Sequence, residues 1–333
     1  MIDKTEEKII HKWGGIQRPL VSICSITYNH ERFISQALDS FLMQITDFPF
    51  EVIVRDDCST DQTAAIIKQY HERFPNIIKP IFETENQYAK GQRPMPIAVQ
   101  QATGKYIAMC EGDDYWTDPL KLQKQVDFLD ANPSYAIGYH DVKIIDDNDT
   151  VIAGCYVSRI KDFSVDEMLS GDATIITSTV MFRNFGTRLF PKIFNRVSNG
   201  DMTLWHMLAH YGPGKFQKDI TSSAYRIHSG GIWSSIGDEM RIRKTIYTLD
   251  ALRKNLPLDK AYLESRISKK IQNYHATILD ILLKKFNFKG YFRYLYKLYS
   301  ENKNDANCAV KRHLVQVANF FLKKSPFKKK TQG

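Results

Sequence analysis

The sequence predicts an α/β protein in which a mostly parallel central sheet is flanked by helices and followed by a basic helical region. Between Pro19 and Tyr139, short runs of β-branched and aromatic residues alternate with segments whose apolar residues recur at helical spacing. Strands that alternate with helices in this way pair mostly in parallel. From about Asp238 onward only helical patterns remain, and cations outnumber anions.

The first part contains four compact apolar runs, each followed by a helical pattern. We expect strands at 21–27, 50–55, 77–82 and 105–110. Pro80 has no N–H to donate, so the third strand should lie at an edge or carry a bulge. The helical patterns cover 31–44, a stretch ending before Pro75, 94–102 and 120–130, with Asp118 and Pro119 as cap and first position of the last helix.

The middle of the chain is less regular than the first part. Segments 136–145 and 174–183 have the composition of strands, 200–212 that of a helix, and 215–228 that of a strand pair or one long strand. Beyond residue 237, where we place a boundary, apolar residues form a helical stripe: Ile267, Ile271, Tyr274, Ile278 and Ile281.

Composition excludes several classes of protein. Of 333 residues, 43% are hydrophobic and 25% charged, and no apolar run approaches the roughly 18 residues of a membrane-spanning helix. The mixed-charge amino terminus does not resemble a secretory signal. Five scattered cysteines suggest neither a disulfide framework nor a zinc site, so we expect reduced thiols and a cytoplasmic protein.

The net charge of +9 is unevenly distributed. Residues 241–333 hold 22 of the 46 Lys and Arg but 6 of the 37 Asp and Glu, which leaves this segment at +16 and the rest at −7. Such a split predicts one part that performs chemistry and another that contacts an anionic surface.

Polar residues follow three of the predicted strands. Thr27-Tyr28-Asn29 ends the first strand, Asp56-Asp57 the second, and Glu111-Gly112-Asp113-Asp114 the fourth. In a parallel sheet these ends meet at one edge, where ligands bind. No Gly-rich phosphate loop is present. Because carboxylates repel a diphosphate, binding one here requires Mg²⁺ or Mn²⁺ between them. The alternative for the acidic loop is a solvated turn.

These motifs occur in an order and at separations that resemble the family 2 glycosyltransferases of the GT-A fold. They are ITYNHERF, VIVRDDCSTDQT, ATGKYIAMCEGDDYWTDPLKL, a helix opened by Gly200-Asp201, and YRIHSGG. The resemblance covers about residues 19–231. It implies a Rossmann-like sheet and an enzyme that moves a sugar from a nucleoside diphosphate to an acceptor hydroxyl with inversion.

The resemblance also implies roles for individual residues. Thr27, Tyr28 and Asn29 would line the base and ribose pocket with Glu31 nearby, and Asp56 would bind the base, usually uracil. In the DxD-like segment, Glu111, in place of the usual Asp, would face the ribose, Gly112 would belong to the donor-binding residues, and Asp113 would ligate the metal. Asp114 would orient this loop. Arg93 would contact phosphate, and the alternative is that it is an arginine of the surface. Asp57 could instead cap the following helix.

Two further residues are matched to the reaction by this resemblance. Asp201 would be the base that takes the acceptor proton, although Gly200 stands where a Glu is common; its alternative role is a helix N-cap. His228 would contact the metal or diphosphate, and Arg226 would support its strand. His206 and His210 lie four residues apart, a spacing that can hold zinc, but the sequence offers no third ligand.

The basic end of the chain interleaves aromatic and cationic residues between 285 and 330. Such a helix fits the surface of an anionic bilayer, which would place an enzyme beside lipid-linked acceptors. The alternative is a helical subdomain that packs its aromatics on the catalytic part. Nucleic-acid binding ranks third, because no reading module is present, and we predict none.

Together these observations predict a metal-dependent inverting glycosyltransferase that uses a nucleoside diphosphate sugar, and we expect a UDP-sugar. The expected acceptor is a glycan or a lipid-linked acceptor in bacterial surface polysaccharide synthesis. We expect an N-terminal extension (1–18), a catalytic domain (19–237) and a helical basic region (238–333), with 19–140 binding the donor and 141–237 facing the acceptor. We expect it in the cytoplasm, at the inner face of the membrane. The alternatives are a sugar nucleotidyltransferase, which should carry a Gly-rich basic loop where TYNHERF stands, and a noncatalytic membrane-attached module.

Overall fold

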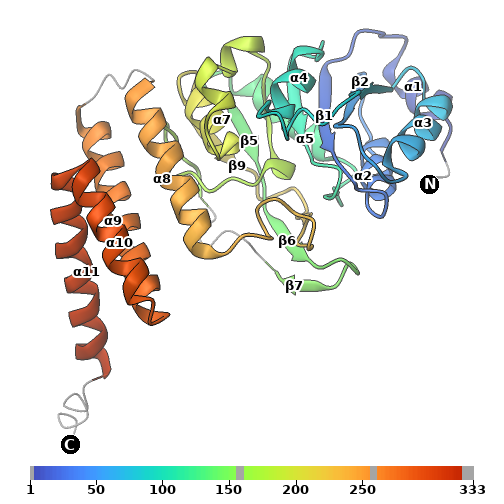
Figure 1. Cartoon of the computed structure of the whole chain (residues 1–333). Helices are drawn as coiled ribbons and strands as arrows, with labels where there is room; N and C mark the ends of the chain where they lie inside the picture. The colour runs from blue at the N-terminus through green and yellow to red at the C-terminus, as the bar shows by residue number, and fades with distance from the viewer. Residues whose placement is uncertain (1–3, 155–160, 256–260, 325–333) are drawn as a thin grey trace, which may run out of the picture. The chain divides into compact units, whose positions relative to one another are not determined.

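The protein is described by a computed structural model that covers residues 4–154, 161–255 and 261–324 (Figure 1). The chain divides into two compact units, and each is described by itself. The first comprises residues 1–196 and 200–235, and the second residues 197–199 and 236–333. Among the described cysteines, Cys24, Cys58, Cys110 and Cys308 are free thiols, whereas Cys155 lies outside the described residues.

A central sheet organises the first unit, and within the described ranges it has seven strands in the order β3-β2-β1-β4-β8-β5-β9. Strands β1 (Val21–Thr27), β2 (Phe50–Asp56), β3 (Ile78–Phe82) and β4 (Tyr106–Met109) pair in parallel. This confirms the predicted mostly parallel sheet. Strand β3 lies at the edge of the sheet. The missing N–H of Pro80 therefore removes no hydrogen bond to a second neighbouring strand.

Helices connect these parallel strands, as the apolar spacing predicted. They are α2 (Ile34–Leu42), α3 (Thr63–Arg73), α4 (Pro94–Gln100) and α5 (Lys121–Ala131). The predicted start of the last helix is wrong, because α5 begins at Lys121 and its N-cap is Leu120. Asp118 lies ahead of the helix, and its carboxylate accepts hydrogen bonds from the N–H groups of Leu120 (2.8 Å) and Thr221 (3.0 Å).

The second half of this unit differs from the prediction in its strands. The single strand expected at 136–145 is two strands, β5 (Ile137–Tyr139) and β6 (Val142–Ile145), which belong to different sheets. Of the strand expected at 174–183 only β8 (Met181–Arg183) forms, after a 3₁₀ turn, η2 (Thr177–Thr179). Segment 215–228 contributes separate strands, β9 (Gly214–Phe216) and β10 (Ser223–Arg226).

A small second sheet, in the order β10-β6-β7, adjoins the ends of the central strands. Strand β7 covers Val151–Ala153 and pairs antiparallel with β6, whereas β10 pairs parallel with β6. Strand β10 also forms a bridge from Ala224 to Tyr115, just after the acidic loop. The helices of this region are α6 (Val165–Leu169), η3 (Gly186–Leu189), η4 (Lys192–Asn195) and α7 (Gly200–Ala209).

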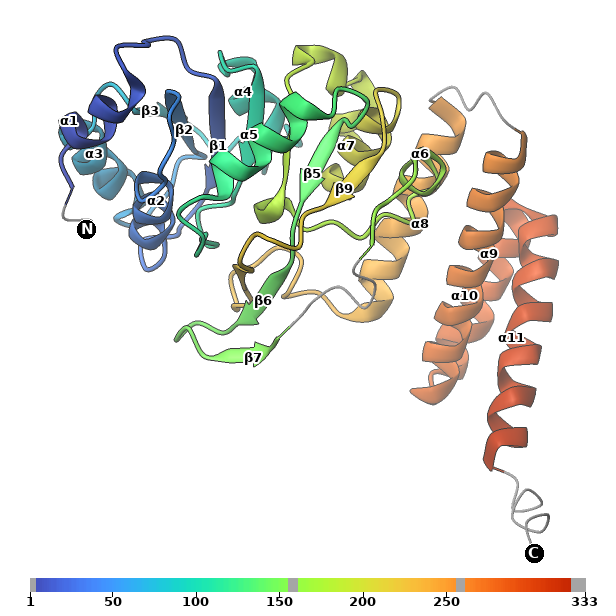
Figure 2. The same cartoon turned by 180° about the vertical axis from the view of Figure 1, so that it is seen from behind.

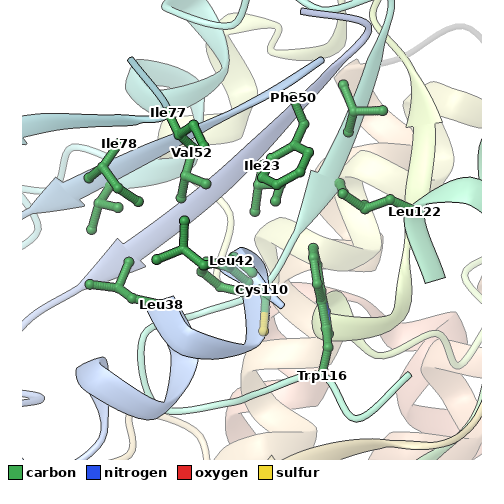
Figure 3. Packing of buried hydrophobic residues seen from close by; sticks show 14 of the residues in the cluster. Ile23, Leu38, Leu42, Phe50, Val52, Ile77, Ile78, Cys110, Trp116 and Leu122 are labelled. Carbon is green, nitrogen blue, oxygen red and sulfur yellow. The ribbon is translucent and has the colours of Figure 1, made fainter. Parts of the chain in front are cut away.

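The main hydrophobic core lies between the parallel strands and helices α2, α3 and α5 (Figure 3). Its buried residues include Ile23, Val52, Leu38 and Trp116, and the Trp116 indole donates to the Ser178 carbonyl at 2.7 Å. This packing ties the residues just after the acidic loop to the sheet. The predicted N-terminal extension packs here too, since Ile9 of α1 (Glu6–Ile10) and Trp13 of η1 (His11–Trp13) belong to the same cluster.

The second unit consists, in its described residues, of long helices. They are α8 (Asp238–Asn255), α9 (Ala261–Lys284), α10 (Phe288–Glu301) and α11 (Lys303–Lys324). Figures 1 and 2 both show α9, α10 and α11 side by side. One cluster of this unit is built from Ile278, Leu279 and Leu282 of α9 with Tyr294 of α10. None of the described helices has the length and apolarity needed to cross a membrane.

Candidate active site

The acidic loop lies at the carboxyl end of β4, against the end of β1. The Gly112 N–H donates to the Ile26 carbonyl at 3.0 Å, which holds the loop on the neighbouring strand. A Cβ atom at Gly112 would lie 2.8 Å from Thr27 Oγ1, too close for any side chain. The close approach of the loop to β1 therefore requires glycine at this position.

Arg226 connects the acidic loop to two other segments, those that contain Gln36 and Asp149. Its side chain is almost fully buried, and its N–H donates to Asp114 Oδ1 at 2.8 Å. The guanidinium donates to the Asp113 carbonyl at 3.0 Å, to Gln36 Oε1 at 2.7 Å and to Asp149 Oδ1 at 2.8 Å. These hydrogen bonds give Asp114 and Arg226 positioning roles, and they fix the backbone of Asp113.

Asp113 meets two histidines from distant parts of the chain. His228 Nε2 lies 3.0 Å from Asp113 Oδ2, and His30 Nε2 lies 3.8 Å from the same oxygen. A carboxylate oxygen and two imidazole nitrogens are thus gathered within 4.8 Å of one another. The three side chains are 18%, 7% and 14% exposed. Imidazole and carboxylate groups are ligands of Mn²⁺ and similar cations, so these residues fit a divalent metal.

The pKa values of the loop carboxyls are shifted in different directions because their surroundings differ. Burial, and then the charge of Asp113, raise the pKa of Glu111 to about 8. Burial, and then the charges of Asp113 and Glu111, raise the pKa of Asp114 well above its usual range. Burial also opposes ionisation of Asp113, but the His228 hydrogen bond and the nearby histidine rings lower its pKa. Of the three loop carboxyls, Asp113 is therefore the one whose surroundings favour the anion.

Asp201 lies in the first turn of α7, one residue inside the start of the helix at Gly200. Asp201 is therefore not the N-cap of α7, and this alternative role is wrong. Burial raises the pKa of Asp201, while hydrogen bonds from the first-turn N–H groups and the charge of Arg93 oppose this rise. The charge of Asp201 in turn contributes to the raised pKa of Glu111. Asp201, Glu111 and Arg93 thus form one electrostatic neighbourhood.

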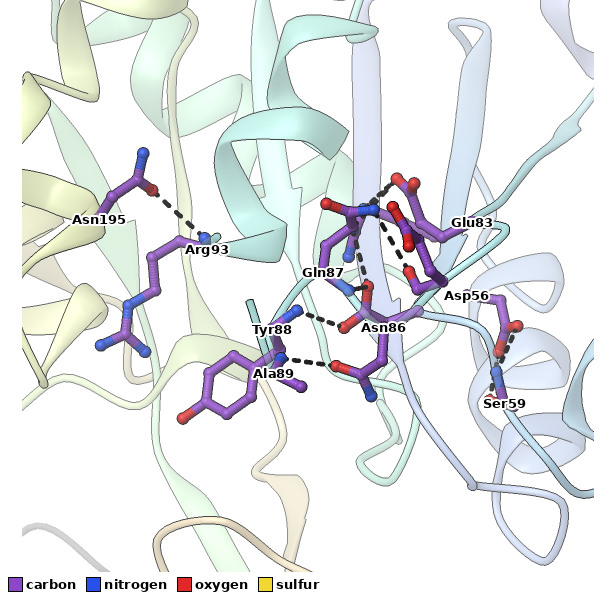
Figure 4. Close-up of polar contacts among 12 residues, drawn as sticks. Asp56, Ser59, Glu83, Asn86, Gln87, Tyr88, Ala89, Arg93 and Asn195 are labelled. Carbon is purple, nitrogen blue, oxygen red and sulfur yellow. Dashed lines mark hydrogen bonds and ion pairs between the residues drawn. The ribbon is translucent and has the colours of Figure 1, made fainter. Parts of the chain in front are cut away.

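A hydrogen bond from its backbone N–H holds Arg93 at the start of α4. Its N–H donates to Asn195 Oδ1 at 3.3 Å, and its guanidinium lies over the Tyr88 ring at 5.5 Å from the centroid (Figure 4). The segment before it is anchored by Asp57, whose carboxylate accepts from the N–H groups of Gln87 (3.0 Å) and Tyr88 (2.9 Å). The alternative of Asp57 as a helix cap is therefore wrong.

The predicted base pocket begins where β1 and β2 end side by side. Thr27 and Asp56 are register partners in the parallel ladder, and Thr27 Oγ1 has no hydrogen-bond partner among the described residues. Asp56 accepts hydrogen bonds from the N–H of Ser59 at 3.0 Å and from its hydroxyl (Figure 4). Tyr28 is half exposed. The structure thus brings Thr27 and Asp56 together.

Asn29 and Glu31 use their side chains to join two loops. Asn29 has a positive φ of 56°, and its Oδ1 accepts from the Thr60 N–H at 2.8 Å. Glu31 accepts from the Gln62 N–H at 2.9 Å. These contacts hold the loop after β1 against the loop after β2. Their predicted contacts with a donor stay predictions.

His30 is the site residue that the sequence reasoning missed. It lies in the TYNHERF motif immediately after β1, so its position at the same sheet edge as Asp113 was a usable signal. Burial lowers the pKa of its imidazole, which favours the neutral ring. The other pair considered, His206 and His210, has no comparable setting: His206 Nδ1 faces the Leu169 carbonyl at 2.8 Å.

Comparisons with known proteins identify the class. The model of the family described as "Glycosyl transferase family 2" matches residues 22–187, about half of the chain. An uncharacterized protein of Mycobacterium tuberculosis H37Rv is 37% identical over 223 residues, which are 66% of this chain and 62% of the relative. The chain belongs to the family 2 glycosyltransferases, and it spans less than two thirds of this relative's length.

Named relatives include WfaP of Escherichia coli, described as UDP-Glc:alpha-D-GlcNAc-diphosphoundecaprenol beta-1,3-glucosyltransferase. It is 29% identical over 214 residues, which are 64% of this chain and 79% of WfaP. Among solved structures, Staphylococcus aureus TarS 1-349 in complex with UDP-GlcNAc has a TM-score of 0.61 at 19% identity, covering 88% of both chains. Mannosyltransferase PcManGT of Pyrobaculum calidifontis, in complex with GDP-Man and Mn²⁺, has a TM-score of 0.52 at 17% identity, covering 89% of this chain and 87% of its own.

These findings confirm the predicted α/β fold and the glycosyltransferase class. The family differs from that of the nucleotidyltransferases, which was one of the alternatives left open by the sequence. The assignment of individual site residues stays a prediction.

Proposed function

We propose that this protein is a metal-dependent inverting glycosyltransferase that uses a UDP-sugar donor. The observation that carries the proposal is the pairing of Asp113 with His228 at 3.0 Å, because these residues lie 115 positions apart and come together at the sheet edge where ligands bind. Asp113 and His228 would hold Mn²⁺ or Mg²⁺. When bound, such a cation neutralises the charge of a departing diphosphate.

The chain's own residues would then divide the remaining work. Glu111 would face the ribose, with Gly112 keeping the loop close to Thr27, and Arg93 would add positive charge near the phosphates. Asp201 would take the proton of the acceptor hydroxyl as that oxygen attacks the anomeric carbon from the face opposite the diphosphate. Its electrostatic coupling to Glu111 and Arg93 supports a position beside the bound donor.

The choice of UDP rests on the pocket at the ends of β1 and β2. The Asp56 carboxylate accepts hydrogen bonds from the Ser59 N–H and hydroxyl, and it would accept a further one from the uracil ring. Thr27 and Tyr28 would line the pocket. The relatives named for UDP-glucose and UDP-GlcNAc support the same choice.

This proposal predicts metal-dependent donor hydrolysis. Purified protein mixed with Mn²⁺ and a panel of UDP- and GDP-sugars should release nucleoside diphosphate slowly from one UDP-sugar, because water replaces the missing acceptor. Chelation with EDTA should abolish the release, and added Mn²⁺ should restore it. Binding of no sugar nucleotide in the panel, with the protein folded by circular dichroism, would rule the function out.

We further propose a glycan or lipid-linked acceptor in surface polysaccharide synthesis, with residues 19–237 as the catalytic part and α10 in contact with an anionic membrane at its cytoplasmic side. The observation that favours a membrane is the surface of α10. Phe288, Phe292 and Tyr296 recur every four residues on one stripe and are 52%, 65% and 78% exposed. The residues that pack α10 into its unit lie on another stripe: Tyr291, Tyr294, Leu295 and Leu298.

A row of cationic side chains runs beside this aromatic stripe on α10. Lys289, Arg293 and Lys297 are exposed and each follows an aromatic residue by one position, so on a helix they form a parallel row. Aromatic side chains at the headgroup level beside cations are typical of helices that lie in a membrane interface. Each cation near an anionic surface adds about 1 kcal/mol of attraction.

Replacing the aromatic stripe should release the protein from vesicles. The triple variant Phe288→Gln, Phe292→Gln, Tyr296→Gln should lower partitioning onto phosphatidylglycerol vesicles by more than about tenfold, since burial of one such side chain is worth about 1.5–3 kcal/mol. Tyr247→Gln, at an exposed aromatic of α8, is the matched control. Cosedimentation equal to that of the native protein would contradict membrane contact through this stripe.

A further inference from the structure

The backbone of His30 is fixed by contacts with the loop after β2. Its N–H donates to Thr63 Oγ1 at 2.8 Å, and the preceding Asn29 is held in a left-handed conformation by its bonds to residues 59 and 60. The imidazole therefore projects from a defined position at the end of β1. It points with Nε2 toward Asp113.

Aromatic packing fixes the ring as well. His30 and His228 lie edge to face at 5.9 Å between ring centroids, and Phe33 contacts the His228 ring at 5.1 Å and the His30 ring at 6.5 Å. The Arg226 guanidinium covers Phe33 at 4.5 Å from the ring centroid. These contacts hold both imidazoles close to the same Asp113 oxygen.

Within the described ranges of the chain, no hydrogen bond of the His30 ring explains why a histidine stands here. The 3.8 Å from Nε2 to Asp113 Oδ2 is too long for a hydrogen bond, and buried Nδ1 has no hydrogen-bond partner among the described residues. A structural histidine in a protein interior normally has its ring nitrogens satisfied. His30 Nε2 instead faces the Asp113 carboxylate oxygen beyond hydrogen-bond distance, in the same group as the His228 ligand atom, and a cation shared by these atoms would use its lone pair.

The donor separations fit a single ion. Ligand atoms at about 2.1 Å from one cation are about 3 Å apart when adjacent and about 4 Å apart when opposite. The separations from Asp113 Oδ2 are 3.0 Å to His228 and 3.8 Å to His30, and all three atoms lie within 4.8 Å of one another. Small side-chain movements would therefore bring His30 into the coordination shell.

We infer that His30 is a third protein ligand of the divalent cation, joining Asp113 and His228. The inference rests on the proposed metal dependence of the enzyme. It extends that proposal, because three protein ligands should let the cation bind before the donor arrives. The end of β1 and the loop after it would then serve both the base pocket, through Thr27 and Tyr28, and the metal, through His30.

Mn²⁺ binding to donor-free protein tests this inference. Isothermal titration with MnCl₂ should give at least about tenfold weaker binding for His30→Ala than for the native chain, since even residues that only orient metal ligands contribute about 10- to 100-fold. Electron spin-echo envelope modulation of bound Mn²⁺ should detect two imidazole nitrogens in the native protein and one in the variant. His11→Ala, at an exposed histidine of η1, is the control and should change neither result.

A second variant separates ligation from packing. His30→Phe keeps a ring against Phe33 and His228 but has no nitrogen, so it should retain the native thermal unfolding midpoint and still lose the Mn²⁺ affinity. Native Mn²⁺ affinity and two nitrogens in both His30 variants would overturn the inference, and so would a loss confined to UDP affinity. If Asp113→Ala also leaves Mn²⁺ binding unchanged, the metal-dependent function fails as well, which distinguishes the two outcomes.

Discussion

Replacing Asp201 by Asn should lower the rate of sugar transfer by about 10²- to 10⁴-fold while leaving donor binding unchanged. The expected loss is that of a general base, and asparagine keeps the shape of the side chain without its basicity. Transfer is measured with the UDP-sugar identified by hydrolysis and a lipid-linked or glycan acceptor. Donor binding is measured separately by titration with UDP and Mn²⁺.

The pH dependence should change together with the rate. Burial raises the pKa of Asp201 above its usual value, so the native rate should fall as the pH falls through that raised pKa, because the base must be unprotonated. The variant should lack this acid limb. Asp238→Asn removes a carboxylate from the first turn of α8 and controls for a mere effect on a helix start. A fully active Asp201→Asn enzyme would exclude Asp201 as the base.

Asp113→Ala should abolish the dependence of donor binding on the metal. The variant removes the loop carboxylate whose pKa is lowered by the neighbouring histidines, and it leaves the two histidines without their shared oxygen. We expect Mn²⁺ affinity to fall by at least about 10- to 100-fold. Titration of UDP with and without Mn²⁺ should show a large difference for the native protein and none for the variant.

A matched control guards against a general electrostatic effect. Asp147→Ala removes an exposed carboxylate that pairs with Arg32 at 3.3 Å, and it should leave UDP affinity unchanged at both metal concentrations. If Asp113→Ala binds UDP with the same Mn²⁺ dependence as the native protein, the metal is held elsewhere and the assignment of Asp113 is wrong.

The regular first half of the fold was predictable because each element is locally consistent. The run VSICSIT forms β1 at the predicted residues, and Pro80 marked the edge strand correctly. The second half was not, because its short strands are set by their partners. One continuous apolar pattern at 136–145 is divided between two sheets, and residues 174–180 form no strand although their composition favours one.

For the site, the sequence determined which chemical groups stand at the strand ends and the order of motifs that defines the family. Neither depends on contacts far along the chain: Asp113 lies in the loop that follows β4, and Thr27 ends β1. The sequence also determined that no described helix could span a membrane, since hydropathy is a local property.

Only the tertiary structure decided which of these groups meet. Asp113, His228 and His30 are brought together by a parallel sheet and the bridge from Tyr115 to Ala224, and no spacing in the sequence encodes that approach. The structure likewise assigned Asp57 to anchoring a loop and Arg226 to holding the acidic turn. The physical reason is that hydrogen bonds and desolvation act over a few ångströms in space, irrespective of distance along the chain.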